Sequence, residues 1–89
     1  MALIEIRWLK DSYECDDCGL SVADGAVVVI DGEEAVDMTP CAHCYDGSDY
    51  DESEVYRAIL ERFGRWTSTA DAREMRAMLE GMGHGVTDA

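Results

Sequence analysis

Four cysteines offer the clearest chemistry in this sequence. Cys15, Cys18, Cys41 and Cys44 form the pattern C-x2-C-x22-C-x2-C. Two residues between cysteines allow a tight turn to direct both sulfurs at one ion, and two such pairs make a closed tetrahedral site. The sequence therefore predicts one structural zinc ion bound by all four thiolates. Iron, two disulfides and unligated thiols are the alternatives.

The first cysteine pair lies in an acidic setting. In "YECDDCG", three of the four residues that adjoin Cys15 and Cys18 are acidic. From Asp11 to Glu54 the chain has fourteen acids and no Lys or Arg, whereas the net charge of the whole chain is -13. A solvated face explains many such stretches, and salt adaptation is a further alternative. Salt adaptation would spread acids everywhere, however, and the segment from Val55 onward has five acids and five arginines.

The size of the chain makes a stabilising metal plausible. A chain of 89 residues and 9.8 kDa builds only a small hydrophobic core and often recruits disulfides, a metal or a second subunit. The start "MALIEIRWLK" lacks the apolar run of a secretory signal, and no stretch approaches a membrane-spanning helix. We expect a cytoplasmic protein, in the host cytoplasm if it is viral. A reducing compartment favours metal over disulfides.

The first half of the chain has the patterns of strands. Residues 3 to 9 alternate apolar and polar side chains, and residues 26 to 30 and 34 to 38 flank Asp31-Gly32, a strong hairpin signal. Pro40 can begin a short helical turn that carries the second cysteine pair, which would favour a treble clef over a ribbon.

The second half has the period of helices. One helix is expected from Ser53 to about Trp66 with Gly64 as its stop, and a second from a capping-box-like start at Ser68 to the glycines near Met82. Their apolar faces contain Val55, Ile59, Leu60, Phe63 and Trp66, and then Ala72, Met75, Leu79 and Met82. We read the methionines Met75, Met78 and Met82 as core residues.

These patterns predict an α+β fold. A zinc-ribbon or treble-clef-like β domain would occupy residues 1–50, and a C-terminal two-helix hairpin residues 51–89, with the two forming one compact domain. Removal of the metal should disorder residues 11 to 50, where apolar side chains are sparse, more than the helical hairpin.

The two cysteine pairs carry a resemblance. "CDDCG" together with "CAHC" resembles the knuckles of rubredoxin-like, zinc-ribbon and treble-clef proteins, over roughly residues 13 to 46. The opening "YECDDCG" is also similar to the first knuckle of rubredoxins, and that likeness would imply iron and electron transfer. The second pair departs from the rubredoxin pattern, because Tyr45 follows Cys44 where that family has glycine.

The sequence gives no reason to expect an enzyme. It contains no nucleophile and base pair and no phosphate-binding loop, and a closed four-cysteine site leaves zinc no position for a substrate. His43, inside the second pair, is expected to point outward as a bystander. His84 is expected to be a mobile surface residue.

Charge suggests the kind of partner. Nucleic acid should be repelled, and no membrane contact is expected, whereas a basic protein surface would be attracted. We expect Asp16, Asp17, Glu33 and Glu34 to bind such a partner, because a knuckle and a hairpin tip are readily presented. The partner surface could be one that normally holds nucleic acid, since the composition is similar to that of bacteriophage inhibitors of host enzymes. A rubredoxin-like iron electron carrier and a zinc-ribbon nucleic-acid or transcription accessory factor are the alternatives, and a homo-oligomer through the helical hairpin stays open.

Overall fold

A long antiparallel hairpin is the largest element of the fold. In the computed structural model, which describes residues 1–45, 47–65, 67 and 69–89, strand β1 (Leu3–Cys15) pairs with β2 (Gly19–Ile30). The pairing runs from Ile4 to Cys15 without a register shift. Strand β3 (Glu33–Met38) is antiparallel to β2, and the short β4 (Gly85–Asp88) lies parallel to the start of β1. The sheet is therefore mixed, in the order β3-β2-β1-β4.

The turn between β2 and β3 is the predicted one. Asp31 and Gly32 have φ values of 52° and 85°, and two successive residues with positive φ are typical of the type I′ turn that suits a tight hairpin. The carboxylate of Asp31 also accepts a hydrogen bond of 2.9 Å from the amide of Leu3. The turn thus holds the beginning of β1.

Two helices lie between β3 and β4 in the chain, and capping residues set their ends. Helix α1 (Glu52–Arg62) and helix α2 (Ala72–Gly81) begin after aspartate N-caps, Asp51 and Asp71, each of which accepts from an amide three residues on. Gly64 (φ 77°) ends α1 as predicted, and Gly83 (φ 94°) ends α2. The expectations for Trp66 and Ser68 lie outside the described residues.

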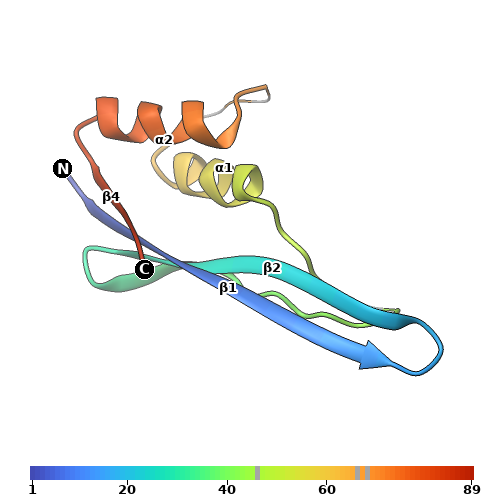
Figure 1. Cartoon of the computed structure of the whole chain (residues 1–89). Helices are drawn as coiled ribbons and strands as arrows, with labels where there is room; N and C mark the ends of the chain where they lie inside the picture. The colour runs from blue at the N-terminus through green and yellow to red at the C-terminus, as the bar shows by residue number, and fades with distance from the viewer. Residues whose placement is uncertain (46, 66, 68) are drawn as a thin grey trace.

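The hydrophobic core lies between the two helices and one face of the sheet (Figure 1). The expected strand face is confirmed, because Ile4 and Ile6 are buried and Trp8 packs at their edge. Met75 is fully buried and Met78 and Met82 pack beside it, so the methionines are core residues as predicted. The buried set is Ile4, Ile6, Ala26, Val28, Val55, Tyr56, Ile59, Leu60, Met75, Leu79 and Val86.

The helices cover only part of the hairpin. Figure 1 shows α1 and α2 above the end of the sheet that carries the chain termini, while the far end of β1 and β2 extends well beyond them. At this far end, Leu20 and Val22 lie on the same side of the sheet as the helices but beyond them, and 68% and 62% of their surface is accessible. We call this uncovered part, residues 9–25, the distal hairpin. The structure is thus α+β as predicted, with an elongated shape of 48 × 29 × 17 Å.

Two expectations are corrected here. The described residues between Pro40 and Tyr50 form no helical turn, since Cys41 instead makes an isolated β-bridge with Ser48. His84 is not a free surface residue, because its Nδ1 accepts a hydrogen bond of 3.0 Å from the amide of Ala2 and its ring stacks on Phe63. The strand β4 that follows His84 is too short to show a periodic pattern in sequence.

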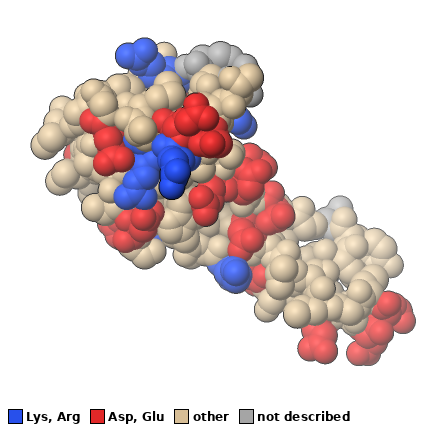
Figure 2. All heavy atoms as spheres, turned by 45° about the horizontal axis from the view of Figure 1, so that its top comes forward, with Lys and Arg blue, Asp and Glu red and all other residues tan. Residues whose placement is uncertain are grey.

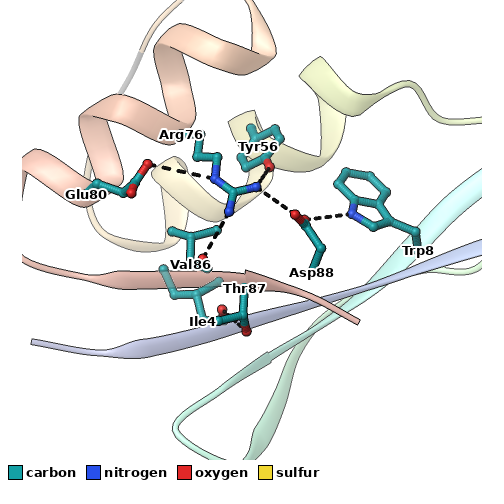
Figure 3. Close-up of polar contacts among 8 residues, drawn as sticks. All are labelled: Ile4, Trp8, Tyr56, Arg76, Glu80, Val86, Thr87 and Asp88. Atoms are coloured by element: carbon teal, nitrogen blue, oxygen red, sulfur yellow. Dashed lines mark hydrogen bonds and ion pairs between the residues drawn. The ribbon is translucent and has the colours of Figure 1, made fainter.

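Strand β4 is held by a polar cluster around Arg76 (Figure 3). The guanidinium of Arg76 donates to a carboxylate oxygen of Asp88 at 2.8 Å and to the carbonyl of Val86 at 3.1 Å. The indole Nε1 of Trp8 donates to the other oxygen of Asp88 at 3.0 Å. Asp88 therefore connects α2 to both β1 and β4.

This cluster makes stability depend on pH. The Arg76 guanidinium and then the Trp8 indole hold the pKa of Asp88 below its ordinary value. Because the folded pKa is the lower one, the contribution is complete above the unfolded pKa of about 3.9 and is lost as pH falls through the folded pKa.

We predict that Asp88→Asn lowers the free energy of unfolding at neutral pH by about 1 kcal/mol, the worth of an exposed charge-assisted hydrogen bond. Urea unfolding at a series of pH values should show a shallower loss of stability below about pH 4 in the variant. Glu33→Gln, which removes the same charge from an exposed site, is the control. Identical pH profiles for Asp88→Asn and the parent would contradict this role.

Candidate metal centre

The first cysteine pair lies at the tip of the distal hairpin. Strand β1 ends at Cys15, β2 begins at Gly19, and these two residues are paired across the turn. Gly19 has a φ of 82°, a conformation that glycine adopts without strain. The nearby backbone N–H groups of Cys18 and then Asp17 lower the pKa of the Cys15 thiol. The turn is therefore shaped to stabilise a thiolate, as metal knuckles are.

The second pair lies on a segment, residues 39–50, that returns along the same hairpin. The backbone groups of Cys41 and Ser48 exchange two hydrogen bonds, of 2.9 and 2.8 Å. The amide of Ala42 donates to the Asp11 carboxylate on β1 at 2.9 Å. Ala42 is buried, as is Ala23, the residue of β2 that pairs with Asp11. Neither belongs to the main core.

Further along, the same segment is joined to β2 twice. The amide of Asp24 donates to a carboxylate oxygen of Asp49 at 2.8 Å, and the amide of Tyr50 donates to the carbonyl of Asp24 at 2.7 Å. Two of the acids in the charged segment, Asp11 and Asp49, are thus structural hydrogen-bond acceptors. Their part in positioning the second cysteine pair could not be recognised from composition.

Three of the four predicted metal ligands come together. The sulfurs of Cys15, Cys18 and Cys44 all lie within 4.8 Å of one another. Tetrahedral zinc with Zn–S bonds of about 2.3 Å separates its sulfurs by roughly 3.8 Å, so small side-chain adjustments would suffice. Burial raises the pKa of Cys44, and its neighbour Cys15 adds to that effect. The three thiols lie close enough to bind a metal ion.

Cys41 is outside this group. It is exposed, and its backbone is fixed by the bridge to Ser48. In the first pair the paired positions Cys15 and Gly19 are four residues apart, whereas Cys41 and Ser48 are seven apart. In this wider second loop Cys44 reaches the cluster, whereas Cys41, at the start of the loop, lies outside it. Its participation as a fourth ligand stays a prediction.

His43 is exposed and is not in the thiol cluster. Its ring lies 4.6 Å from that of Tyr13, centroid to centroid, and its Nδ1 accepts a hydrogen bond of 3.2 Å from the amide of Tyr45. His43 therefore packs the second cysteine loop against β1.

The four residues expected to bind a partner do not form one surface. Asp16 and Asp17 are exposed at the metal end, between β1 and β2, whereas Glu33 and Glu34 are exposed at the opposite end of β2. Strand β2 has 12 residues, which at about 3.3 Å each span roughly 40 Å. A single small surface on a partner would contact only one of the two pairs.

Charge is also distributed unevenly along the molecule. In the view of Figure 2 the narrow end carries red acidic side chains and no blue ones, while blue side chains gather over the broad end that carries the helices. Five of the seven basic residues, all arginines, lie from position 57 onward. Of the other two, Lys10 lies 3.6 Å from the Asp24 carboxylate.

No known protein family, curated protein or solved structure matches this chain. Among the described residues, no helix is long and apolar enough to cross a membrane. The function must therefore be argued from the cysteine cluster, the charge and the shape.

Gly25 is a residue that the sequence analysis missed. A Cβ atom at this position would lie 2.1 Å from the carbonyl oxygen of Met38 and 2.8 Å from Cδ of Pro40, both far inside contact distance. Only glycine lets the chain cross over β2 there and turn toward the metal end. A glycine just before a β-branched run was the available signal, but it does not indicate what approaches.

We predict that Gly25→Ala lowers zinc affinity at least about tenfold. The added methyl group would push residues 39–50 away from β2 and so displace Cys44 from the first pair. Helical circular dichroism should be retained, since Gly25 does not belong to the core under the helices. Affinity would be measured by competition with a chelating dye.

The matched control is Gly81→Ala, since an added Cβ there meets no atom within 4 Å. That variant should bind zinc like the parent. Unchanged affinity in Gly25→Ala would show that the crossing does not position the second cysteine pair.

Proposed function

We propose that this protein is a small, acidic zinc-binding module that acts by docking its metal end on a basic surface of a partner protein. The observation that carries the proposal is the cluster of Cys15, Cys18 and Cys44 at the tip of a hairpin that no helix covers. The distal hairpin lacks an apolar core of its own, so a metal ion there would supply its rigidity.

Zinc fits this donor set best. Thiolates at short spacing suit zinc and iron alike. Tyr45 follows Cys44 where the rubredoxin pattern has glycine, so the second loop departs from the iron-binding pattern. We therefore take zinc, which has no redox activity and suits closed thiolate sites, as the occupant. Cys41, three residues before Cys44, is the available thiol for the fourth position.

Charge supports a basic protein partner over nucleic acid. Asp16 and Asp17 are exposed beside the cluster, and Glu14 adjoins it. A zinc ion with three or four thiolates carries no net positive charge, so the metal does not offset these acids. Phosphates would be repelled, and a basic surface, including one that ordinarily holds nucleic acid, would be attracted. A non-catalytic role is part of the same proposal.

The metal site can be tested by serine substitution. Purified protein should contain one zinc per chain. Cys15→Ser, Cys18→Ser and Cys44→Ser should each lower zinc affinity by more than about a hundredfold, because each removes a ligand from a preformed cluster. Cys41→Ser should lower zinc affinity less, by about tenfold, since water can take the fourth position on the metal. Equimolar iron with a red, reversible chromophore would contradict the zinc assignment and favour an electron carrier.

The docking end can be tested with two variants of equal charge. Asp16→Asn/Asp17→Asn and Glu33→Gln/Glu34→Gln each remove two negative charges, from opposite ends of β2. The probe is a short synthetic peptide of alternating arginine and valine. The first variant should slow association about three- to tenfold at low salt and flatten its salt dependence, and the second should behave like the parent.

Equal effects of the two variants would show that only net charge attracts the peptide, and would overturn docking through the metal end. Tight binding of duplex DNA at physiological salt would overturn the choice of a protein partner.

A further inference from the structure

One edge of the sheet is open next to the metal end. Within the described residues, β4 pairs with β1 only from Leu3 to Ile6, and the last hydrogen bond of that side joins the amide of Ala89 to the carbonyl of Ile6. Beyond Ile6, β1 pairs on its other side alone, with β2, as far as Cys15. About half of β1 therefore has one free edge.

The backbone groups on this edge can be identified by alternation. The carbonyls of Ala2 and Ile6 accept from the β4 side, while the carbonyl of Leu3 accepts from Asp31 on the β2 side. Amide and carbonyl groups of alternate residues point to the same edge of a strand. The backbone amide and carbonyl groups on the free edge are therefore those of Trp8, Lys10, Ser12 and Glu14. Among the described residues they have no pairing partner.

This edge lacks most of the features that protect edge strands. Soluble proteins block such edges with proline, bulges, very short strands or several lysines. The segment from Trp8 to Glu14 contains no proline, and its pairing with β2 has no bulge. Its one lysine, Lys10, is paired with Asp24.

Charge decides which strand this edge can accept. Asp11, Glu14, Asp16 and Asp17 lie on or beside it against one lysine, and a second copy of the chain would add a further net charge of -13. Self-pairing is therefore opposed by repulsion, whereas an extended basic segment would be attracted.

A cleft beside the edge adds to this selectivity. It is lined by aromatic Trp8 and Tyr50 and by the carboxylates of Asp24, Asp49 and Glu52. Trp8 and Lys10 belong to the helix-facing side of β1, so a residue on an added strand opposite Trp8 would point to the same side as the cleft. A cationic side chain opposite Trp8 would lie beside its indole ring and avoid the like charge of Lys10.

The geometry points to strand addition: a basic, extended segment of the partner pairs with the free edge of β1 from Trp8 to Glu14. This rests on the proposed function and specifies how the basic partner is held. Backbone hydrogen bonds would provide register, and the acids and the cleft would select alternate cationic residues.

The test uses the zinc-loaded protein and two peptides of the same alternating arginine–valine sequence. One is unmodified, and the other is N-methylated at alternate amides, so that its charge is retained but one edge cannot donate. We expect the unmodified peptide to bind at least about tenfold more tightly. Amide exchange should then slow at Lys10, Ser12 and Glu14, but not further at Asp11 and Tyr13, whose amides already face β2.

A substitution provides a second, independent readout. Ser12→Pro removes an edge donor without touching the pairing to β2 and should lower affinity for the unmodified peptide about tenfold, whereas Ser12→Ala should not. Zinc content and circular dichroism show whether Ser12→Pro is folded. If it is not, the exchange pattern of the parent protein decides.

The outcomes separate two failures. Equal binding of both peptides, with the Asp16→Asn/Asp17→Asn variant still weakened, would overturn strand addition and leave docking at the metal end. Failure of both peptides to bind, or equal weakening by both charge variants, would overturn the proposed function as well. Protection of the same amides at high protein concentration without peptide would overturn the peptide assignment in favour of a second copy.

Discussion

The β1–β2 hairpin is longer than the two helices can cover, and this difference in length determines how each end of the molecule is stabilised. The end near the chain termini is sealed by α1 and α2, where Val28, Ile59 and Leu79 are buried. At the other end Leu20 and Val22 remain exposed. An isolated two-stranded ribbon is only marginally stable in water, so the distal hairpin requires another source of order. The returning segment, residues 39–50, packs there, and we propose that a metal ion bound by the thiol cluster supplies the rest.

The two ends of the molecule therefore have different kinds of stability. The broad end combines hydrophobic burial with the polar cluster of Arg76, Asp88 and Trp8, which attaches β4 to the sheet and to α2. The narrow end has a few hydrogen bonds that the carboxylates of Asp11 and Asp49 accept, together with three clustered cysteines. In our proposal a metal ion orders this end, and because a metal site needs little apolar surface, acids and an open strand edge can be displayed there without loss of the fold.

Periodicity and turn chemistry made much of this fold predictable. The alternation around Ile6, the Asp31-Gly32 turn and the helical stop at Gly64 all depend on local sequence, and each is present. The features that were missed depend on contacts between distant residues. Neither the crossing at Gly25, nor the short β4, nor the acceptor role of Asp11 leaves a periodic signal. Among the site residues, spacing indicated that the two cysteine pairs meet, but only the folded segment shows that Cys44 lies near the first pair while Cys41 lies outside the cluster.

We propose that a bound metal ion orders the distal hairpin, whereas the helix-covered end is stable without it. The most direct measurement is amide exchange, residue by residue, with zinc bound and after chelation. If metal orders the distal hairpin, amide protection falls after chelation at Tyr13, Ala23 and Ala42 and persists at Ile6, Val28 and Ile59. The loss of protection is then confined to the uncovered end, a smaller region than the residues 11 to 50 expected from the sequence. Unchanged protection at Ala23 and Ala42 after complete removal of zinc would contradict this role of the metal, as would simultaneous loss at both ends.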